Sequence, residues 1–159
     1  MEKTAISERK TYDFFISYYQ ATGLPYARHL RKHAEELNRK AFLDKEDIRA
    51  DIREDSDEFR LQVDRAIANS KNFILVMTLG FKDRPEVKRE WTVASKLGIT
   101  RLLFKKDTLD NQDLLVQIDE DKIDFSSLPY TSFHSECDLL EEVENRLRGK
   151  SIDKKNVII

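Results

Sequence analysis

A single carboxylate falls on the apolar face of a predicted amphipathic helix over residues 85–98, PEVKREWTVASKLG. At 3.6 residues per turn, that face has four apolar members: Val87, Trp91, Ala94 and Leu97. Glu90 lies beside Trp91 within the same arc, so it points toward the helix contact or into a cleft at its edge. A carboxylate in such a place is paired, loses its charge or has a function. Two interpretations stay open: a glutamate satisfied by a neighbouring arginine or backbone amide, and a glutamate in a ligand site.

The glycines, histidines, cysteine and clustered acids of the chain lack the spacing or the neighbouring residues that a binding or catalytic site would need. The four glycines are nowhere spaced as in a phosphate-binding loop or a dinucleotide fingerprint. His29 and His33 have the four-residue spacing of a metal pair, but no third ligand accompanies them, so we interpret them as solvent-facing and expect no metal. Cys137 stands between two acids that disfavour a thiolate, and we interpret it as a packing residue. The acidic segment 44–58 lacks the glycine and the ligand spacing of a calcium loop.

Length and composition predict one folded domain. The chain has 159 residues, of which 40% are hydrophobic and 36% are charged. Its net charge is −2 and its basic residues alternate with acids, so we expect no nucleic-acid partner. A single cysteine fits a reducing compartment, and no apolar run approaches the roughly 20 residues of a membrane span. We expect a cytoplasmic protein with a flexible lead-in at 1–10, a domain at 11–149, and a tail or junction at 150–159.

Hydrophobic patterns alternate between strand and helix along the chain. Apolar and aromatic runs predict strands at 12–18, 41–43, 73–77 and 101–104, with a fifth at 116–118 or 123–125. Helical periodicity predicts helices from Pro25 to about Asn38, after a cap at Ser56, over 85–98, and after a cap at Ser135. Between them, segment 44–55 is rich in acids and arginines, and we expect an exposed loop or a loose helical turn.

This alternation predicts the α/β class, with a flavodoxin-like, doubly wound, five-stranded parallel sheet in the order 2-1-3-4-5. In that order a ligand crevice lies between the carboxyl ends of the first and third strands. Three residues end the first strand: Ser17, Tyr18 and Tyr19. The third strand ends at Thr78 and Leu79, and Thr78 stands where a phosphoacceptor receiver would have an aspartate. The helix that leaves the third strand carries Glu90, so this carboxylate and the expected crevice coincide.

Four successive motifs resemble landmarks of the TIR (Toll/interleukin-1 receptor) domain family, most like its prokaryotic-type members: YDFFISY, AFLDKEDI, AIANSKNFILVMT and REWTVA. The resemblance extends from Tyr12 to Arg148, and YDFFISY is its most specific part. It implies the flavodoxin-like fold deduced above and one of two activities. Many TIR domains cleave NAD+ at the nicotinamide glycosidic bond, whereas others only scaffold signalling complexes through TIR–TIR contacts.

The resemblance also implies roles for individual residues. It matches Glu90 with the catalytic glutamate of enzymatic members, and segment 44–55 with the mobile loop that gates the pocket and mediates self-association. Four residues of that loop are expected to take part in assembly: Asp44, Asp47, Arg49 and Arg53. The substrate would be NAD+, with no further cofactor. The expected substrate-binding residues lie around the crevice: Ser17, Tyr18, Tyr19, Thr78, Leu79 and Glu86.

One carboxylate suffices for this chemistry. Nicotinamide leaves NAD+ as a neutral molecule because its ring nitrogen is already cationic, so no acid has to protonate it. Glu90 would hold the ribose hydroxyls and stabilise the oxocarbenium-like charge. Tyr18 or Tyr19 would stack on the nicotinamide or adenine ring, with strand-end packing as the alternative for Tyr18. Arg49 or Arg53 would meet the pyrophosphate, unless both form exposed ion pairs with neighbouring acids.

Three positions depart from the family pattern. Glu86 stands four residues before Glu90, where enzymatic members often carry tryptophan. Asp83 and Arg84 stand near the helix start, where serine is common, and Asp51 replaces the usual glycine of the loop. Repulsion between Glu86 and Glu90 favours protonation of whichever is more buried. The first hypothesis is an NAD+ glycohydrolase activated by self-association, and the alternatives are a TIR scaffold without turnover and a nucleotide sensor.

Overall fold

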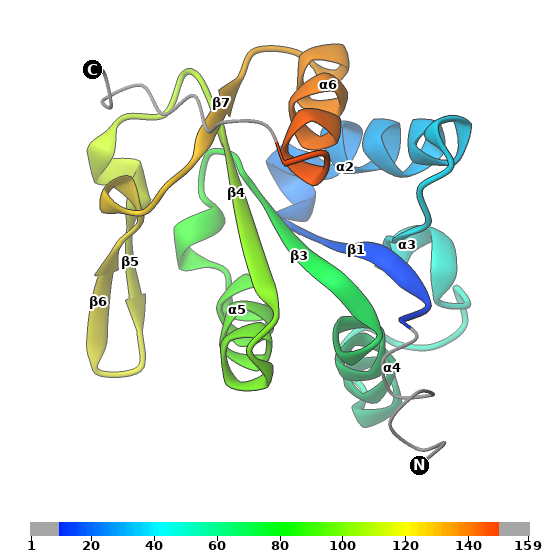
Figure 1. Cartoon of the computed structure of the whole chain (residues 1–159). Coiled ribbons are helices and arrows are strands. Elements are labelled where there is room, and N and C mark those ends of the chain that lie inside the picture. Colours follow the sequence, from blue (N-terminus) through cyan, green and yellow to red (C-terminus); the bar gives the residue numbers. More distant parts are fainter. Residues whose placement is uncertain (1–9, 150–159) are drawn as a thin grey trace.

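The computed structural model describes residues 10–149 and places five parallel strands in one sheet, in the order β2-β1-β3-β4-β7 (Figure 1). The strands are β1 Tyr12–Tyr18, β2 Ala41–Phe42, β3 Ser70–Met77, β4 Thr100–Lys106 and β7 Thr131–Phe133. Counted along the chain within this sheet, they follow the order 2-1-3-4-5, so the predicted α/β fold is confirmed. The predictions for residues 1–9 and 150–159 lie outside the described residues.

Helices cover both faces of the sheet (Figure 1). The α-helices are α2 Gln20–Ala34, α3 Asp44–Asp47, α4 Asp57–Ala68, α5 Pro85–Leu97 and α6 Glu136–Leu147, and the 3-10 turns are η1 Glu35–Leu37, η2 Phe81–Asp83, η3 Asn111–Leu114 and η4 Phe125–Ser127. α2 and α6 pack on one face, and α4 and α5 on the other. Among residues 10–149, no helix has the length and apolar character needed to cross a bilayer.

The two central strands explain why the sheet forms. β1 and the second half of β3 are made mostly of aromatic, β-branched or aliphatic residues, which suit a strand covered on both sides. Phe15 and Phe73 stack in the core under α4 and α5, with ring centroids 5.7 Å apart. Phe14 and Ile74 point the other way, into the core under α2 and α6. This alternation fixes the strand register and therefore the position of the crevice residues at the end of β1.

The fifth strand of the sheet is β7, and the prediction of a strand at 116–118 or 123–125 is wrong for this position. Those segments pair with each other as an antiparallel hairpin, β5 Leu115–Ile118 and β6 Asp121–Asp124, which turns at Asp119 with a φ of 56°. The hairpin buries Val116 but leaves Gln117 exposed, so only one side packs on the domain. β7 buries Thr131 and Phe133 beside β4, but a three-residue run gives no periodic signal in the sequence.

The helix predicted to begin at Pro25 begins at Gln20. Gly23 donates its backbone N–H to the Tyr19 carbonyl at 2.7 Å, which closes the first helical turn. A Cβ at Gly23 would lie 3.1 Å from Oγ1 of Thr78 at the end of β3. The glycine that looks like a helix breaker in the sequence is therefore the residue that lets α2 approach the sheet.

Candidate active site

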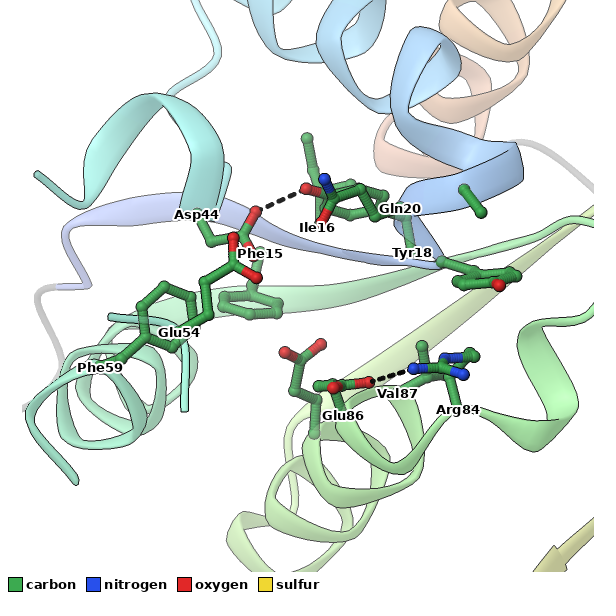
Figure 2. Close-up of a pocket in the computed structure, with 13 residues that line it drawn as sticks. Phe15, Ile16, Tyr18, Gln20, Asp44, Glu54, Phe59, Arg84, Glu86 and Val87 are labelled. Carbon is green, nitrogen blue, oxygen red and sulfur yellow. Dashed lines mark hydrogen bonds and ion pairs between the residues drawn. The ribbon is translucent and has the colours of Figure 1, made fainter. Parts of the chain in front are cut away.

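A cavity of about 360 Å³ lies between the carboxyl end of β1, the first turns of α5, and the segment from α3 to the start of α4 (Figure 2). Tyr18 and Tyr19 line it from the end of β1, and Glu86 and Glu90 line it from α5. Asp44, the first residue of α3, closes a further side. A cavity thus lies at the end of β1 beside the predicted carboxylate, but its other walls come from α5 and the segment after β2, not from the end of β3.

The sequence of α5 determines where Glu90 lies. Pro85 occupies the first turn, where its missing N–H costs no hydrogen bond, and Gly98 ends the helix with a φ of 70°. Val87, Trp91 and Ala94 are buried against the sheet, which fixes the rotation of the helix about its axis. The position of Glu90 follows from that rotation. The side chain lies at the edge of the buried stripe and faces the cavity.

Glu90 has one hydrogen-bond donor from the sheet. The Ser17 hydroxyl, fully buried in β1, donates to Oε1 of Glu90 at 2.7 Å. Burial in the surrounding protein raises the pKa of Glu90 to about 8, and the nearby Asp44 adds to the rise, whereas the Ser17 hydrogen bond opposes it. The group is therefore largely protonated at pH 7 and becomes an anion on the alkaline side.

A second cavity of about 410 Å³ adjoins the first between α4 and α5. Four residues line both cavities: Glu54, Phe59, Glu86 and Glu90. Glu90 therefore lines both cavities.

Tyr18 and Asp44 connect the cavity wall to the predicted gating loop. The Tyr18 hydroxyl donates to Oδ1 of Asp44 at 2.7 Å, and the backbone N–H of Lys45 donates to the same oxygen at 2.7 Å. Burial raises the pKa of Asp44, although the hydrogen bond from Tyr18 works against that rise. Lys45 also forms an ion pair with Glu54, so the two ends of the loop are joined.

The remaining predicted loop residues lie outside the cavity. Asp47 accepts hydrogen bonds from Arg31 and from the backbone of Leu43. Arg49 pairs with Asp51 and Arg53 pairs with Asp55, and the two arginine side chains are 75% and 79% exposed. These are the exposed ion pairs that were the alternative to a pyrophosphate contact.

At the end of β3, neither of the two expected crevice residues lines the cavity. Thr78 is buried and its Oγ1 lies 2.8 Å from Oγ1 of Thr22 in α2. Leu79 is 61% exposed. Ser17 does not line the cavity either. Its hydroxyl donates a hydrogen bond to Glu90, which does line it.

Among the cavity residues that the sequence analysis did not assign to the site are Glu54, Phe59 and Arg84. The guanidinium of Arg84 lies 5.0 Å from the centroid of the Tyr19 ring, and Nη2 lies 3.8 Å from Oε1 of Glu86. A signal for Arg84 existed, because the residue before a helix-initiating proline at this switch point must lie at the crevice edge. Glu54 reaches the cavity through the path of the loop, for which the sequence gives no pattern, whereas Phe59 reaches it from the first turn of α4.

No metal centre is formed in the part of the chain that the structure describes. His29 and His33 are half-buried, not solvent-facing as predicted, and their rings lie 4.3 Å apart because residues four apart are neighbours on one face of a helix. Cys137 is exposed at the start of α6, so its interpretation as a packing residue is wrong. The buried stripe of that helix runs through Leu139 and Val143 instead.

Solved structures with the same fold include three proteins of low sequence identity. The TIR domain of the Toll-related receptor TRR-2 from Hydra magnipapillata is 18% identical with a TM-score of 0.60, covering 87% of this chain and 100% of the other. A metazoan TIR-STING receptor from C. gigas, solved with 2′,3′-cGAMP, is 15% identical with a TM-score of 0.63, covering 90% of this chain and 41% of the receptor.

The TIR domains of the activated Roq1 resistosome, which recognises the pathogen effector XopQ, are 17% identical with a TM-score of 0.53. This match covers 65% of this chain and 62% of the other. At such identities these three likenesses show the fold alone.

No curated protein sequence matches the chain. The family model described as "TIR domain" matches residues 14–148, which include both the sheet and the cavity. The chain therefore belongs to the TIR domain family.

Proposed function

We propose that this TIR domain is an NAD+ glycohydrolase that breaks the bond between nicotinamide and ribose, with Glu90 as its catalytic residue. One observation carries the proposal: the Glu90 carboxyl, held by Ser17, opens into a cavity at the switch point of the sheet. Burial raises the pKa of this group to about 8, a shift typical of carboxyls that act on a ligand.

The chemistry fits a single carboxylate. The C1′–N bond breaks with its electron pair passing to the ring nitrogen, so nicotinamide leaves neutral without an acid. Glu90, ionised beside the cationic substrate, accepts hydrogen bonds from the ribose hydroxyls and stabilises positive charge as it develops at C1′. Water then adds to C1′ and releases a proton, giving ADP-ribose; attack by a group of the same molecule would give a cyclic isomer.

Assembly and biological setting belong to the same proposal. The loop 44–55 is joined at its ends by the ion pair of Lys45 with Glu54, and it presents Arg49 and Arg53 to solvent. We infer that this loop gates the cavity and mediates self-association, and that the activity serves immune or defence signalling in the cytoplasm, as in prokaryotic-type members. The Roq1 resistosome, with its TIR domains, supports a link between this fold and pathogen recognition.

A second candidate is a TIR scaffold without turnover. It is favoured by the protonated state of Glu90 near pH 7 and by the exposed charges of the loop, which suit protein contacts. A sensor that binds a nucleotide without cleaving it is a third possibility.

Concentrated or clustered protein incubated with NAD+, followed by chromatography for free nicotinamide, separates these candidates. The glycohydrolase releases nicotinamide, and Glu90→Gln and Glu90→Ala lose the activity while their circular dichroism spectra stay unchanged. A scaffold neither releases nicotinamide nor gives heat on titration with NAD+. A sensor gives heat on titration, with the wild type and with Glu90→Gln, but releases no nicotinamide.

A further inference from the structure

The charges that line the first cavity are unevenly distributed. Four carboxyl groups line it: Asp44, Glu54, Glu86 and Glu90. Among the described residues, Arg84 is the one cation in its lining. Figure 2 shows Arg84 at the opposite end of the cavity from Asp44 and Glu54. Two carboxyl groups therefore lie at one end of the cavity, and Arg84 lies at the other end beside Glu86, with its Nη2 3.8 Å from Oε1 of Glu86.

Arg84 is held in place before any ligand arrives. It has an extended backbone just before Pro85, and its guanidinium lies over the Tyr19 ring at 5.0 Å. The Tyr19 ring is itself confined, because a Cβ at Gly80 would lie 3.0 Å from one of its carbons. Such a stacked guanidinium loses little freedom when it binds an anion.

Arg84 also keeps hydrogen-bonding capacity. Its ion pair with Glu86 is long, because Nη2 lies 3.8 Å from Oε1, beyond the range of a hydrogen bond. A guanidinium has five N–H donors in a fork that matches the oxygens of a phosphate. The loop arginines differ: Arg49 and Arg53 make hydrogen bonds to Asp51 and Asp55 at 3.1 and 2.8 Å, away from the cavity.

We propose that Arg84 binds the pyrophosphate of the dinucleotide, so that NAD+ lies with its phosphates at the Arg84 end and its nicotinamide toward Asp44 and Glu54. This inference rests on the proposed NAD+ glycohydrolase activity and adds the orientation of the substrate to it. NAD+ is itself polarised, with a cationic ring at one end of the nicotinamide riboside unit and two anionic phosphates at the other. The opposite orientation would place the phosphates among carboxylates and the cationic ring beside a guanidinium.

The orientation makes Arg84 a residue that distinguishes substrates by their phosphates. Nicotinamide riboside has the same reacting bond and the same cationic ring as NAD+ but no phosphate. Removal of the guanidinium should therefore weaken binding of NAD+ and leave the affinity for the riboside nearly unchanged. Reduced NADH keeps the phosphates but has a neutral ring. It should therefore bind with lower affinity than NAD+, although the two molecules are almost the same size.

Steady-state kinetics of Arg84→Gln with the two substrates tests this inference. We expect the KM for NAD+ to rise about tenfold with kcat within about twofold, as for loss of one charge-assisted contact in binding. The KM for nicotinamide riboside should change by less than about twofold, and Arg84→Lys, which keeps the charge without the fork, should fall between Gln and wild type for NAD+. The matched control is Arg65→Gln, which removes the same charge from an exposed position on α4.

Equal KM changes for both substrates, or no change for NAD+, would overturn the inference while leaving the glycohydrolase itself intact. Calorimetry with ADP-ribose gives a readout that needs no turnover. Binding to the wild type that falls about tenfold in Arg84→Gln but not in Arg65→Gln supports the phosphate site, even if the wild type releases no nicotinamide and the proposed activity fails. Absence of ADP-ribose binding, or equal binding by wild type and Arg84→Gln, contradicts it. A thermal unfolding curve for each variant shows that the fold is retained.

Discussion

Glu90 is subject to two opposing effects on its charge. Burial favours the protonated carboxyl, and the hydroxyl of Ser17 favours the anion by donating to Oε1 at 2.7 Å. The outcome is a group with a pKa of about 8 at the wall of a cavity. At pH 7 this carboxyl is mostly protonated. A positively charged ligand would favour its ionised form, because the cation offsets the cost of burying the negative charge.

The pH dependence of activity follows from this pKa. If ionised Glu90 is the active form, kcat/KM for NAD+ should rise with pH, with its midpoint at about 8, since it reports the free enzyme. A pKa raised above the ordinary carboxyl value places the change on the neutral to alkaline side. Initial rates of nicotinamide release from about pH 6 to about pH 9.5 measure the profile. A profile that is flat above about pH 6 would mean that Glu90 ionises normally or plays no part.

Ser17→Ala tests the opposing contribution. Without the hydroxyl, nothing from β1 stabilises the anion, so the inflection of the pH profile should move to higher pH by about one unit. The matched control is Ser70→Ala, which removes an equally buried hydroxyl bonded to the Ala66 carbonyl, away from the cavity. A profile that stays at the wild-type position in Ser17→Ala would show that the hydrogen bond does not set the pKa of Glu90.

At the level of elements, the long periodic segments and the short strand β2, expected at 41–43, were predictable, whereas the last strand of the sheet was not. β1 and β3 are continuous apolar runs, and α4 and α5 carry clear helical stripes, so their positions are confirmed. β7 has three residues and gains its place only by pairing with β4. The start of α2 was missed because Gly23 serves close packing against Thr78, whereas a glycine in a sequence normally signals a break.

The same division holds for the site. Glu90 and the end of β1 could be located because strand order and helix periodicity both point to one edge of the sheet. Arg84, Glu54 and Phe59 reach the cavity through a helix start and an irregular segment, where side-chain direction depends on tertiary contacts. Thr78 was placed at the correct strand end, but its side chain is used by the contact with Thr22.

Tyr18→Phe tests whether the hydrogen bond to Asp44 holds the loop to the sheet. Loss of this bond, worth about 1 kcal/mol, should raise the population of the open loop about fivefold. Trypsin should then cut faster after Arg49 and Arg53. The control is Tyr26→Phe, whose ring packs against Phe133 on the other face of the sheet. Equal cleavage rates in wild type and Tyr18→Phe would show that other contacts hold the loop.

For the whole molecule, the cavity and the exposed arginines of the loop lie at the same edge of the sheet. The cavity lies at the carboxyl edge of the central strands, while the exposed arginines of segment 44–55 extend from the same edge into solvent. The ion pair of Lys45 with Glu54 joins that segment to the cavity wall. Contacts made by the loop with another copy can therefore influence the shape of the cavity, which is how self-association would activate it.

Charge reversal of the loop tests the assembly. Arg49→Glu combined with Arg53→Glu should reduce self-association. Each new glutamate adds a negative charge beside the aspartate with which the arginine formed an ion pair. Light scattering at increasing protein concentration measures the effect, and nicotinamide release per molecule should fall in parallel. Arg65→Glu combined with Lys122→Glu makes the same charge change at exposed positions outside the loop. An unchanged molar mass for the loop variant would exclude these arginines from the assembly.

The central claim is that the Glu90 carboxyl cleaves NAD+, and the most direct measurement is the amount of nicotinamide formed by concentrated wild-type protein beside Glu90→Gln at about pH 8. Glutamine keeps the size of the side chain and can still meet Ser17, but it cannot become an anion. The account predicts steady accumulation of nicotinamide with the wild type and a rate lower by about 100-fold or more with the variant. Equal rates from the two proteins, or no nicotinamide from the wild type at any concentration, would contradict it.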